Sequence, residues 1–323
     1  MTQQAIEPTV GYAEGDWQQR WLWVDGELRP WAEVTMPLTQ ATWSGLSAVF
    51  EGIKGYRSHE GVLHIFGLQQ HLERFQNSIA FMRLRSRWST EELGAACIES
   101  LTANGLDDDC YLQPVAAPVP PASGMYAPPV IDDEARIYIP VGPRPSLLLT
   151  ERALRCNVAS WTRISDRSMP PRIKAVPNYQ NSRIAHLDSK LSGFDSPIFL
   201  NERGSVAEGP GACIAIVRGG AVITPPVTAG ILESITRAFL LELIPVVLGL
   251  PVVEREIDRT ELYMAQEAFC LGTGAEVSPV THIDHYRVGN GEIGPITRRV
   301  QHAYHDAIRA IDTRWLEWLT PVQ

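Results

Sequence analysis

A segment from Pro118 to Pro129, dense in proline, glycine, serine and alanine, interrupts the patterned sequence on both of its sides. Because proline and glycine disfavour the interior of helices and strands, this composition indicates a loop or linker. A chain of 323 residues is long enough for two domains of ordinary size. We therefore predict a small N-terminal α/β domain at 1–134, which includes a polar arm at 1–18, an interdomain linker region at 120–147 and a large C-terminal domain at 148–323.

Strand and helix patterns alternate along both halves of the chain without a strict strand–helix–strand rhythm. An Asp25-Gly26 pair between apolar residues predicts a hairpin, and apolar residues at helical spacing from Leu68 to Met82 predict an amphipathic helix. The sequence from Tyr111 to Val119 predicts one strand, and a last helix is predicted from Pro295 to Trp318. This mixture favours a mixed α/β fold of the α+β kind over a doubly wound parallel sheet.

The charge and hydropathy of the chain argue against several classes of partner. The formal net charge is −9, and lysine and arginine are scattered rather than clustered, which disfavours nucleic acids and anionic membranes. The longest apolar run, 238–253, contains Glu242, Pro245 and Pro251, which a membrane span tolerates poorly. The sequence does not start with basic residues followed by an apolar stretch, so we predict no secretory signal. We expect a soluble, cytoplasmic protein that acts on small molecules.

Cysteine and histidine patterns give no sign of a metal site. The five cysteines are odd in number and widely spaced, without a Cys-x-x-Cys pair, so neither a disulfide framework nor a structural zinc site is expected. We expect buried free thiols instead. His282 and His285 are close in sequence, but their predicted loop position favours surface histidines over a metal pair.

The stretch 171–211 holds the candidate chemistry. Lys174 stands close to Tyr179, and Glu208 follows after a predicted helix and hairpin in an apolar, glycine-rich setting. A lysine that forms a Schiff base needs a pocket that lowers its pKa, and a pyridine cofactor needs an acid that keeps its ring nitrogen protonated. Both residue types occur here. Taken alone, a lysine at this position is far more often a solvated loop lysine than a catalytic one.

Six motifs in order, from about Trp21 to Ala307, make this chain similar to a known family. The chain resembles the fold type IV pyridoxal 5′-phosphate (PLP) enzymes, and most of all their branched-chain aminotransferase branch. The resemblance implies a two-domain fold like that of D-amino acid aminotransferase, with PLP bound in the large C-terminal domain. The motifs are Phe50-Glu51-Gly52-Ile53, His71-Leu72-Glu73-Arg74, Lys174 with Asn178-Tyr179, Ala207-Glu208-Gly209, Ile235-Thr236-Arg237, and Gly272-Thr273-Gly274-Ala275-Glu276 with Pro279.

The resemblance also implies a role for each motif residue. Lys174 would be the Schiff-base lysine and would move the proton between Cα of the substrate and C4′ of the cofactor. Glu208 would hydrogen-bond the pyridinium nitrogen, and Tyr179 would contact the ring hydroxyl. The phosphate would be bound by the remaining cofactor-binding residues, which are Arg74, Ile235, Thr236 and Thr273.

The predicted substrate pocket departs from the family pattern. Gly45, Gln113 and Arg144 stand where the branched-chain enzymes have a tyrosine, an arginine and a second tyrosine, and Val141 replaces a tryptophan. The loss of one arginine beside the gain of another suggests that the carboxylate site has moved or that a bulkier substrate is accepted. The predicted substrate-binding residues are Phe50, Tyr111, Gln113, Arg144 and Gly274.

The resulting hypothesis is a PLP-dependent transaminase for an amino acid and a 2-oxo acid, with a donor range that differs from that of the branched-chain enzymes. Three alternatives stay open: an (R)-selective amine transaminase, an aminodeoxychorismate-lyase-like enzyme, and a PLP-binding relative that has lost turnover. The family resemblance further implies a homodimer.

Overall fold

The computed structural model describes residues 20–119, 125 and 128–322. The predicted arm at 1–18 and much of the predicted loop at 118–129 lie outside the described residues. The secondary structure is a mixture of helices and of parallel and antiparallel strands, so the predicted mixed α/β class is confirmed. The division into two domains near residues 120–147 stays a prediction.

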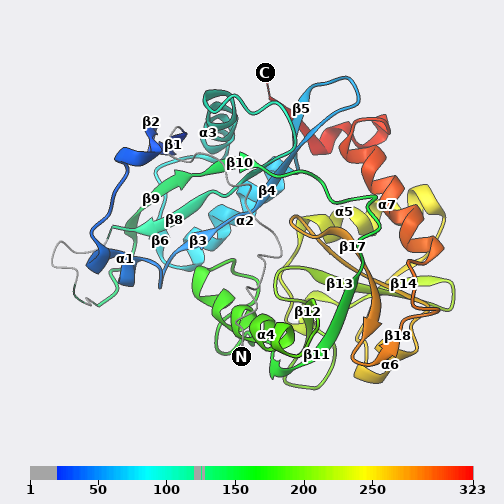
Figure 1. Cartoon of the computed structure of the whole chain (residues 1–323). Coiled ribbons are helices and arrows are strands. Elements are labelled where there is room, and N and C mark those ends of the chain that lie inside the picture. The colour runs from blue at the N-terminus through cyan, green and yellow to red at the C-terminus, as the bar shows by residue number, and fades with distance from the viewer. Residues whose placement is uncertain (1–19, 120–124, 126–127, 323) are drawn as a thin grey trace, which may run out of the picture.

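Two sheets are formed by the strands before residue 144 together with one strand from the end of the chain (Figure 1). The first has the order β2-β1-β9-β8-β3, with β6 parallel to β9, and the second has the order β10-β7-β4-β5-β19. The first sheet comprises β1 (Trp21–Val24), β2 (Glu27–Pro30), β3 (Val49–Phe50), β6 (Leu84–Arg85), β8 (Val115–Pro118) and β9 (Asp133–Ile139). The second comprises β4 (Ile53–Arg57), β5 (Leu63–Phe66), β7 (Cys110–Leu112), β10 (Val141–Pro143) and β19 (Leu319–Pro321).

Within the described residues, the third sheet has eight strands in the order β12-β11-β17-β16-β13-β14-β15, with β18 on β17. Its pairings are mixed, because β11 runs parallel to both β12 and β17 whereas β13, β16 and β17 are antiparallel. Its strands are β11 (Leu154–Thr162), β12 (Ser196–Leu200), β13 (Cys213–Arg218), β14 (Ala221–Thr224), β15 (Val252–Glu254), β16 (Glu267–Gly272), β17 (Glu276–Ile283) and β18 (Tyr286–Arg287).

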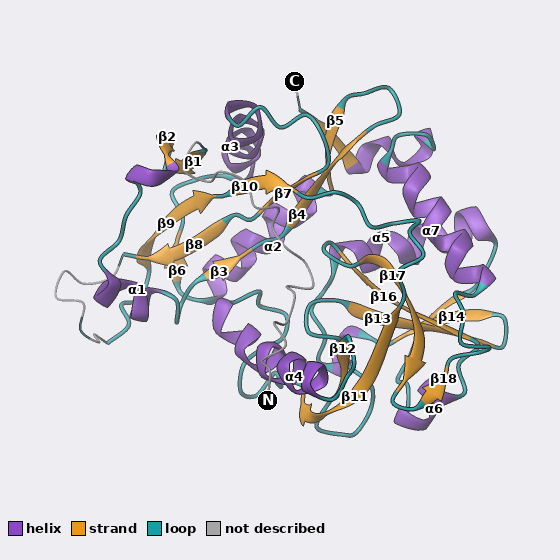
Figure 2. Ribbon diagram, in the orientation of Figure 1, coloured by secondary structure: helices purple, strands orange, loops and turns teal. Residues whose placement is uncertain are grey.

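Helices cover these sheets (Figure 2). Helix α2 packs on α3, helix α4 packs on strands β11 and β12, and helices α5 and α7 pack on strand β16. The helices are α1 (Leu38–Ser44), α2 (Leu68–Phe81), α3 (Thr90–Ala103), α4 (Tyr179–Leu191), α5 (Ile235–Leu243), α6 (Arg259–Tyr263) and α7 (Pro295–Ile308). Short helical turns are η2 (Trp31–Glu33), η3 (Val176–Asn178), η4 (Val227–Ala229), η5 (Ile244–Leu248) and η6 (Thr313–Trp318).

Several local predictions are confirmed by the backbone. Asp25 and Gly26 both have positive φ, 50° and 97°, as a tight two-residue hairpin turn requires, and they join β1 to β2. The apolar face of α2 is buried from Leu68 to Ile79. The N-terminus of α3 is fixed by a capping box, in which Ser89 accepts from the Glu92 N–H and the Glu92 carboxylate accepts from the Ser89 N–H. All five cysteines are buried and free.

Two predicted elements are wrong in extent. The single strand predicted from Tyr111 to Val119 is divided into β7 and β8, which belong to different sheets. Pro114 lies at the break, where it has no N–H for a ladder hydrogen bond. The last helix ends at Ile308 rather than Trp318, because Ala310 has a φ of 55°, a left-handed conformation that cannot continue a right-handed helix.

Aromatic side chains join the second sheet to the helices of the third. Phe66 at the end of β5 packs edge-on against Phe239 of α5, with ring centroids 5.0 Å apart, and stacks on Trp318 of η6 at 5.7 Å. Tyr304 of α7 completes the cluster at 5.7 Å from Phe66. This packing fixes α2, which begins two residues after Phe66, against the first turn of α5. None of the helices described is long and apolar enough to cross a bilayer.

Candidate active site

Residues from distant parts of the sequence meet in one cavity of about 220 Å³, here called the central cavity. Gln113, Ile235 and Thr236 are the predicted site residues that do not line it. Other lining residues that carry polar groups and that the sequence did not single out are Arg163, Cys213 and Ser234. The predicted site residues that do line it are Phe50, Arg74, Tyr111, Arg144, Lys174, Tyr179, Glu208, Thr273 and Gly274.

Lys174 is half-buried and is held between β3 and α4. Its backbone carbonyl accepts from the Phe50 N–H at 3.0 Å, and Ala175 bridges to Val49. The Lys174 Nζ donates to the Tyr179 hydroxyl at 2.7 Å and stands 4.8 Å from the centroid of the Phe50 ring. The Phe50 and Tyr179 rings pack edge-on at 4.9 Å, so they fix the position of the ammonium nitrogen from two sides.

The chain contains three lysines, and only Lys174 has its nitrogen in the central cavity. The Lys54 Nζ forms a buried ion pair with Glu276 at 2.7 Å, and the Lys190 Nζ lies 3.7 Å from a carboxylate oxygen of Asp195. The partner of Lys174 is a neutral hydroxyl instead. Any chemistry that needs a lysine amine in this cavity therefore depends on Lys174.

Glu208 is buried on the opposite side of the cavity, with 3% of its surface exposed. One carboxylate oxygen accepts from the Arg163 guanidinium at 2.7 Å and from the Leu232 N–H at 3.0 Å, and the other faces the Cys213 thiol at 3.7 Å. Burial raises the pKa of Glu208, although Arg163 opposes the shift. Arg163 follows β11 directly, and neither its spacing nor its neighbours in sequence signal this contact.

Arg74 projects from α2 toward the N-terminus of α5. Its Nε and Nη2 donate to the two carboxylate oxygens of Glu51 at 2.7 and 2.8 Å, and its Nη1 donates to the carbonyl of Glu233 at 2.6 Å. Ser234 caps α5, because its hydroxyl accepts from the Arg237 N–H at 3.3 Å. A guanidinium beside a helix N-terminus attracts anions through its charge and through the free N–H groups of the first turn.

Glu51 and His71 support Arg74 from the interior, and sequence reasoning gave neither of them a role. Glu51 is fully buried and also accepts from the His71 Nδ1 at 2.8 Å. Burial alone would raise the pKa of Glu51, but Arg74 and His71 hold it below its ordinary value. The sequence does indicate that His71 and Arg74 lie close together, because they are three residues apart and so share one face of a helix.

Tyr111 and Arg144 form the wall of the cavity that faces the Thr273-Gly274 turn. The Arg144 guanidinium carbon lies 4.4 Å from the centroid of the Tyr111 ring. A Cβ at Gly52 would stand 1.9 Å from the Tyr111 hydroxyl, so only glycine fits at this position. A Cβ at Gly274 would stand 3.1 Å from an Arg144 nitrogen. These glycines keep Tyr111 and Arg144 close to the backbone of the cavity.

A buried ion pair holds the turn in place. Glu276 follows the Thr273-Gly274 turn, and each of Glu276 and Lys54 is 2% exposed. The second carboxylate oxygen of Glu276 accepts from the Leu147 N–H at 2.9 Å. Burial lowers the pKa of Lys54, and Glu276 opposes this shift. The contact ties β4 and the segment after β10 to the start of β17.

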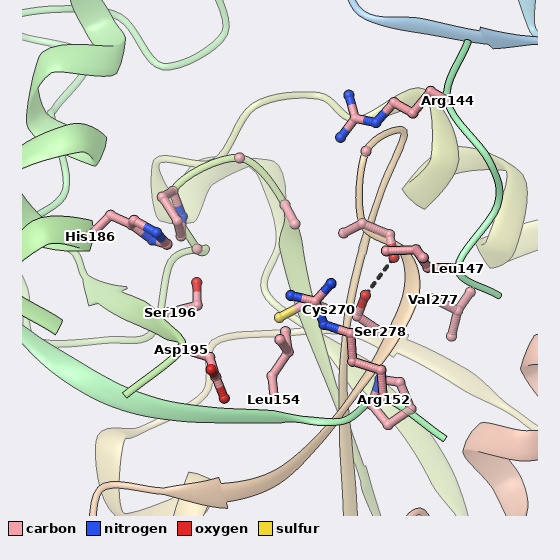
Figure 3. A pocket seen from close by; sticks show the side chains of 17 residues that line it. Arg144, Leu147, Arg152, Leu154, His186, Asp195, Ser196, Cys270, Val277 and Ser278 are labelled. Atoms are coloured by element: carbon pink, nitrogen blue, oxygen red, sulfur yellow. Dashed lines mark hydrogen bonds between the residues drawn. The ribbon is translucent and has the colours of Figure 1, made fainter. Parts of the chain in front are cut away.

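Further cavities adjoin the central one in the described part of the chain. A cavity of about 270 Å³ shares Arg144, Gly274 and the segment 209–212 with it. Figure 3 shows Arg144 at one end of this cavity, apart from His186 and Asp195. A larger cavity of about 570 Å³, here called the side chamber, shares Phe50 and Tyr179 with the central cavity and contains Gln113. Its lining residues are Met36, Ala41, Ser44, Gly45, Ala48, Phe50, Gln113, Val115, Ala117, Tyr138, Pro140, Val176 and Tyr179.

Comparison with known proteins decides the family. Residues 48–283 match the family model described as Amino-transferase class IV. The chain belongs to the class IV aminotransferase family. This class IV aminotransferase is 37% identical to the probable branched-chain-amino-acid aminotransferase of Aquifex aeolicus over 92% of its own length and 95% of the relative's. It is 30% identical to the branched-chain-amino-acid aminotransferase of Escherichia coli K12, over 88% and 91% of the two chains.

Solved structures show the same relationship. The branched-chain amino acid aminotransferase of Thermobaculum terrenum in its PLP form superposes on this class IV aminotransferase with a TM-score of 0.90 at 41% identity, covering 95% of this chain and 99% of that one. The branched-chain aminotransferase of Thermoproteus uzoniensis with norvaline gives a TM-score of 0.87 at 36% identity, covering 94% and 99%. The resemblance and the fold type predicted from the motifs are therefore confirmed.

Proposed function

We propose that this aminotransferase uses pyridoxal 5′-phosphate to move an amino group between an amino acid and a 2-oxo acid. The observation that carries the proposal is the meeting of Lys174, Tyr179 and Glu208 in one cavity, with Arg74 at the N-terminus of α5. An amine, a buried carboxyl and an anion-binding helix end are the groups that this cofactor needs. The relative solved in its PLP form supports the same choice of cofactor.

The residues present fit a phosphorylated pyridine. Thr236 is buried in the first turn of α5, two residues after Ser234, which lines the central cavity. This turn lies next to the helix end where the Arg74 guanidinium stands, so an anion bound there would meet the N–H groups of the first turn. Glu208 would hold the ring nitrogen and Tyr179 the ring hydroxyl. The groups proposed for the phosphate are Arg74, the N–H groups of Ile235 and Thr236, and the hydroxyls of Thr236 and Thr273.

Proton transfer is assigned to Lys174. When bound, the cofactor supplies an electron-withdrawing ring that stabilises negative charge on the carbon bearing the amino group of the substrate. Lys174 would take a proton from that carbon, and its contact with the Tyr179 hydroxyl at 2.7 Å fixes where its nitrogen stands. Because burial raises the pKa of Glu208, its carboxyl keeps a proton more readily than an exposed one and can share it with the ring nitrogen.

Arg144 is assigned to a carboxylate of the substrate. Its guanidinium lines the central cavity above the Tyr111 ring and beside Gly274. A guanidinium binds a carboxylate through two parallel hydrogen bonds, which orients the substrate as well as attracting it. This cation favours amino acids and 2-oxo acids over amines that lack a carboxylate.

The proposal is tested by the absorbance of the purified holoenzyme. An amino donor alone should bleach the cofactor band at once, and a 2-oxo acid should restore it. Lys174→Ala should abolish both changes, whereas Lys190→Ala, in which a lysine paired with Asp195 is replaced, should leave them intact. Release of pyruvate without an acceptor would instead show a lyase. A band that no donor changes would show a protein without turnover.

We further propose a homodimer in the cytoplasm. The described surface exposes large apolar side chains, including Leu38 at 85% and Ile131 at 78% of their surfaces. Exposed apolar residues of this size are typical of surfaces that a partner covers. Light scattering of the purified protein should give twice the mass of 35.8 kDa, and the mass of a single chain would contradict the proposal.

A further inference from the structure

The cavity of about 270 Å³ beside the central cavity is lined by His186 of α4 and is here called the α4 cavity. We propose that it is a separate binding site for a small carboxylate with an apolar body, and that a carboxylate bound there competes with the substrate for Arg144. The binding does not depend on turnover. The competition rests on the proposed transaminase function, in which Arg144 binds a carboxylate of the substrate.

A short stretch of backbone separates the α4 cavity from the groups assigned to the reaction. The segment 209–212, which follows Glu208, and Gly274 line both cavities. Lys174 and Tyr179 line the central cavity and not the α4 cavity. A ligand in the α4 cavity would therefore pack against the other side of this segment and would leave the space beside Lys174 open.

Charged side chains around the α4 cavity favour an anion. Arg144 stands at one end, and Figure 3 shows the Arg152 side chain extending toward the middle of the cavity. Asp195 also lines the cavity, but its carboxylate lies 3.7 Å from the Lys190 Nζ and accepts from the Arg155 N–H at 2.8 Å. The described lining thus brings two guanidinium charges together with one carboxylate that already has a cation beside it.

His186 offers a further polar contact. Its Nδ1 is buried and has no hydrogen-bond partner among the described residues. Burial and the nearby Lys190 lower the pKa of His186, against the opposing effect of Asp195, so the imidazole is neutral at about pH 7. A neutral imidazole can carry its proton on Nδ1. A carboxylate oxygen in the cavity would accept this N–H and satisfy the buried atom.

Apolar side chains and a modest volume define the body of the ligand. Pockets for drug-sized molecules enclose about 300–1,000 Å³, and the α4 cavity is smaller, at about 270 Å³. It therefore suits a molecule of about the size of an amino acid. Benzoate has this chemistry, because its ring covers apolar surface and its carboxylate matches the fork of a guanidinium. The apolar lining includes Leu147, Leu154, Ala212, Val277 and Pro279.

Arg144 connects the two cavities. A Cβ at Gly274 would stand 3.1 Å from an Arg144 nitrogen, so the guanidinium lies against the turn that borders both cavities. Its N–H donors lie in one planar fork, and donors that turn to a carboxylate on one side are lost to a carboxylate on the other. The ligand should therefore raise the KM of the amino donor to a limit. An occupant of the central cavity would raise it without limit.

The first test measures the binding of benzoate to the holoenzyme by calorimetry, with benzamide as the uncharged control. Benzamide should bind about 10-fold more weakly or less, because hydrogen bonds between charged groups are the stronger ones. Ser196→Phe, which fills the cavity from β12, and Arg152→Gln, which removes a charge, should each weaken the binding of benzoate by about 10-fold or more.

Arg155→Gln is the matched control for Arg152→Gln. Arg155 is an exposed arginine three residues further along the chain that does not line the α4 cavity, so its loss should leave the affinity within about 2-fold. If benzoate does not bind, or if it binds equally to the wild type, Ser196→Phe and Arg152→Gln, the site is wrong.

The second test follows the half-reaction with an amino donor as benzoate is added. In the wild type the apparent KM should rise by about 10-fold and then level off, while the rate at saturating donor stays within about 2-fold. Ser196→Phe should have the wild-type KM without benzoate and should lose this rise. A rise that never levels off and is equal in Ser196→Phe would place benzoate in the central cavity alone and overturn the inference.

A 2-oxo acid is itself a small carboxylate, so the same variants identify the source of the ligand. Inhibition of the wild type by excess 2-oxo acid, relieved in Ser196→Phe, would assign the site to the acceptor. Inhibition by benzoate alone would assign it to a carboxylate other than the acceptor. If no donor changes the cofactor band, the transaminase function fails, and calorimetry still decides whether the α4 cavity binds a carboxylate.

Discussion

The central cavity and the side chamber are adjacent, yet charged side chains line the first and apolar side chains line the second. In the central cavity the charged groups are held in fixed pairs, Lys174 with Tyr179, Glu208 with Arg163, and Arg74 with Glu51. Among the residues that the structure describes, those lining the side chamber carry no charge, and the chamber owes its shape to small and apolar side chains. The comparison teaches that fixed pairs hold the groups of the first cavity in place, whereas the second has no such pairs to break, so that substitutions in the second need not disturb the first.

The largest expected effect is a loss of folding stability. It is expected for a substitution beside the central cavity and not for one in the side chamber. Glu51→Gln removes the charge that pairs with the partly buried Arg74, and breaking a buried pair typically costs about 3–5 kcal/mol of unfolding free energy. Chemical denaturation of the holoenzyme measures this cost. Glu27→Gln breaks an exposed pair with Arg29, with 65% and 57% of the two side chains exposed, and should change stability by about 0–1 kcal/mol.

The same variant should weaken cofactor binding, since Arg74 loses the carboxylate that orients it. Gly45→Ser in the side chamber is the matched comparison and should change neither stability nor cofactor retention. If Glu51→Gln were as stable as Gly45→Ser, the contrast between a rigid charged cavity and a tolerant apolar one would be wrong.

A smaller effect is expected from Arg144, the cation assigned to a carboxylate of the substrate. Arg144→Ala should lower kcat/KM for amino acid donors by about 10–100-fold, because a hydrogen bond to a charged group contributes about 1.5–3 kcal/mol. It should not affect an amine that lacks a carboxylate. Arg144→Lys, which keeps the charge but not the fork of donors, should lie between the two. Unchanged kcat/KM for every amino acid donor would remove Arg144 from the substrate site.

The smallest and most gradual effect is that of pH on stability. Because the pKa of Glu51 is lowered in the folded state, its contribution is complete above its ordinary value of 4.5 and is lost as the pH falls toward the folded pKa. The loss should approach about 1.4 kcal/mol for each pH unit below 4.5. Denaturation curves from pH 7 to pH 3 measure it. Glu51→Gln should show a shallower dependence than Glu27→Gln, and parallel curves would exclude Glu51 as the source.

The fold family and most of the lining of the central cavity could be predicted from the sequence, because short motifs place glycines, a lysine and carboxylates at fixed spacing. Glu51 stood inside one such motif, but its contact with Arg74 depends on how β3 and α2 pack. Arg163 carries no motif at all. Gly45 and Gln113 were placed at the substrate pocket from the sequence, but the volume of the side chamber could not be foreseen, because it arises where α1, β3, β8 and β9 meet with small residues between them.

The pairing of strand β19 affects the order in which parts of the protein fold. Its residues Leu319–Pro321 pair with His64–Phe66 of β5, and the carbonyl of Trp318 accepts from the N–H of Gly67, directly before α2. Pairings this distant in sequence close a very long loop and form late in folding. During synthesis, the edge of β5 that pairs with β19 therefore stays unpaired until residue 321 has left the ribosome. The helix that carries Arg74 is then anchored by a segment that is made long after it.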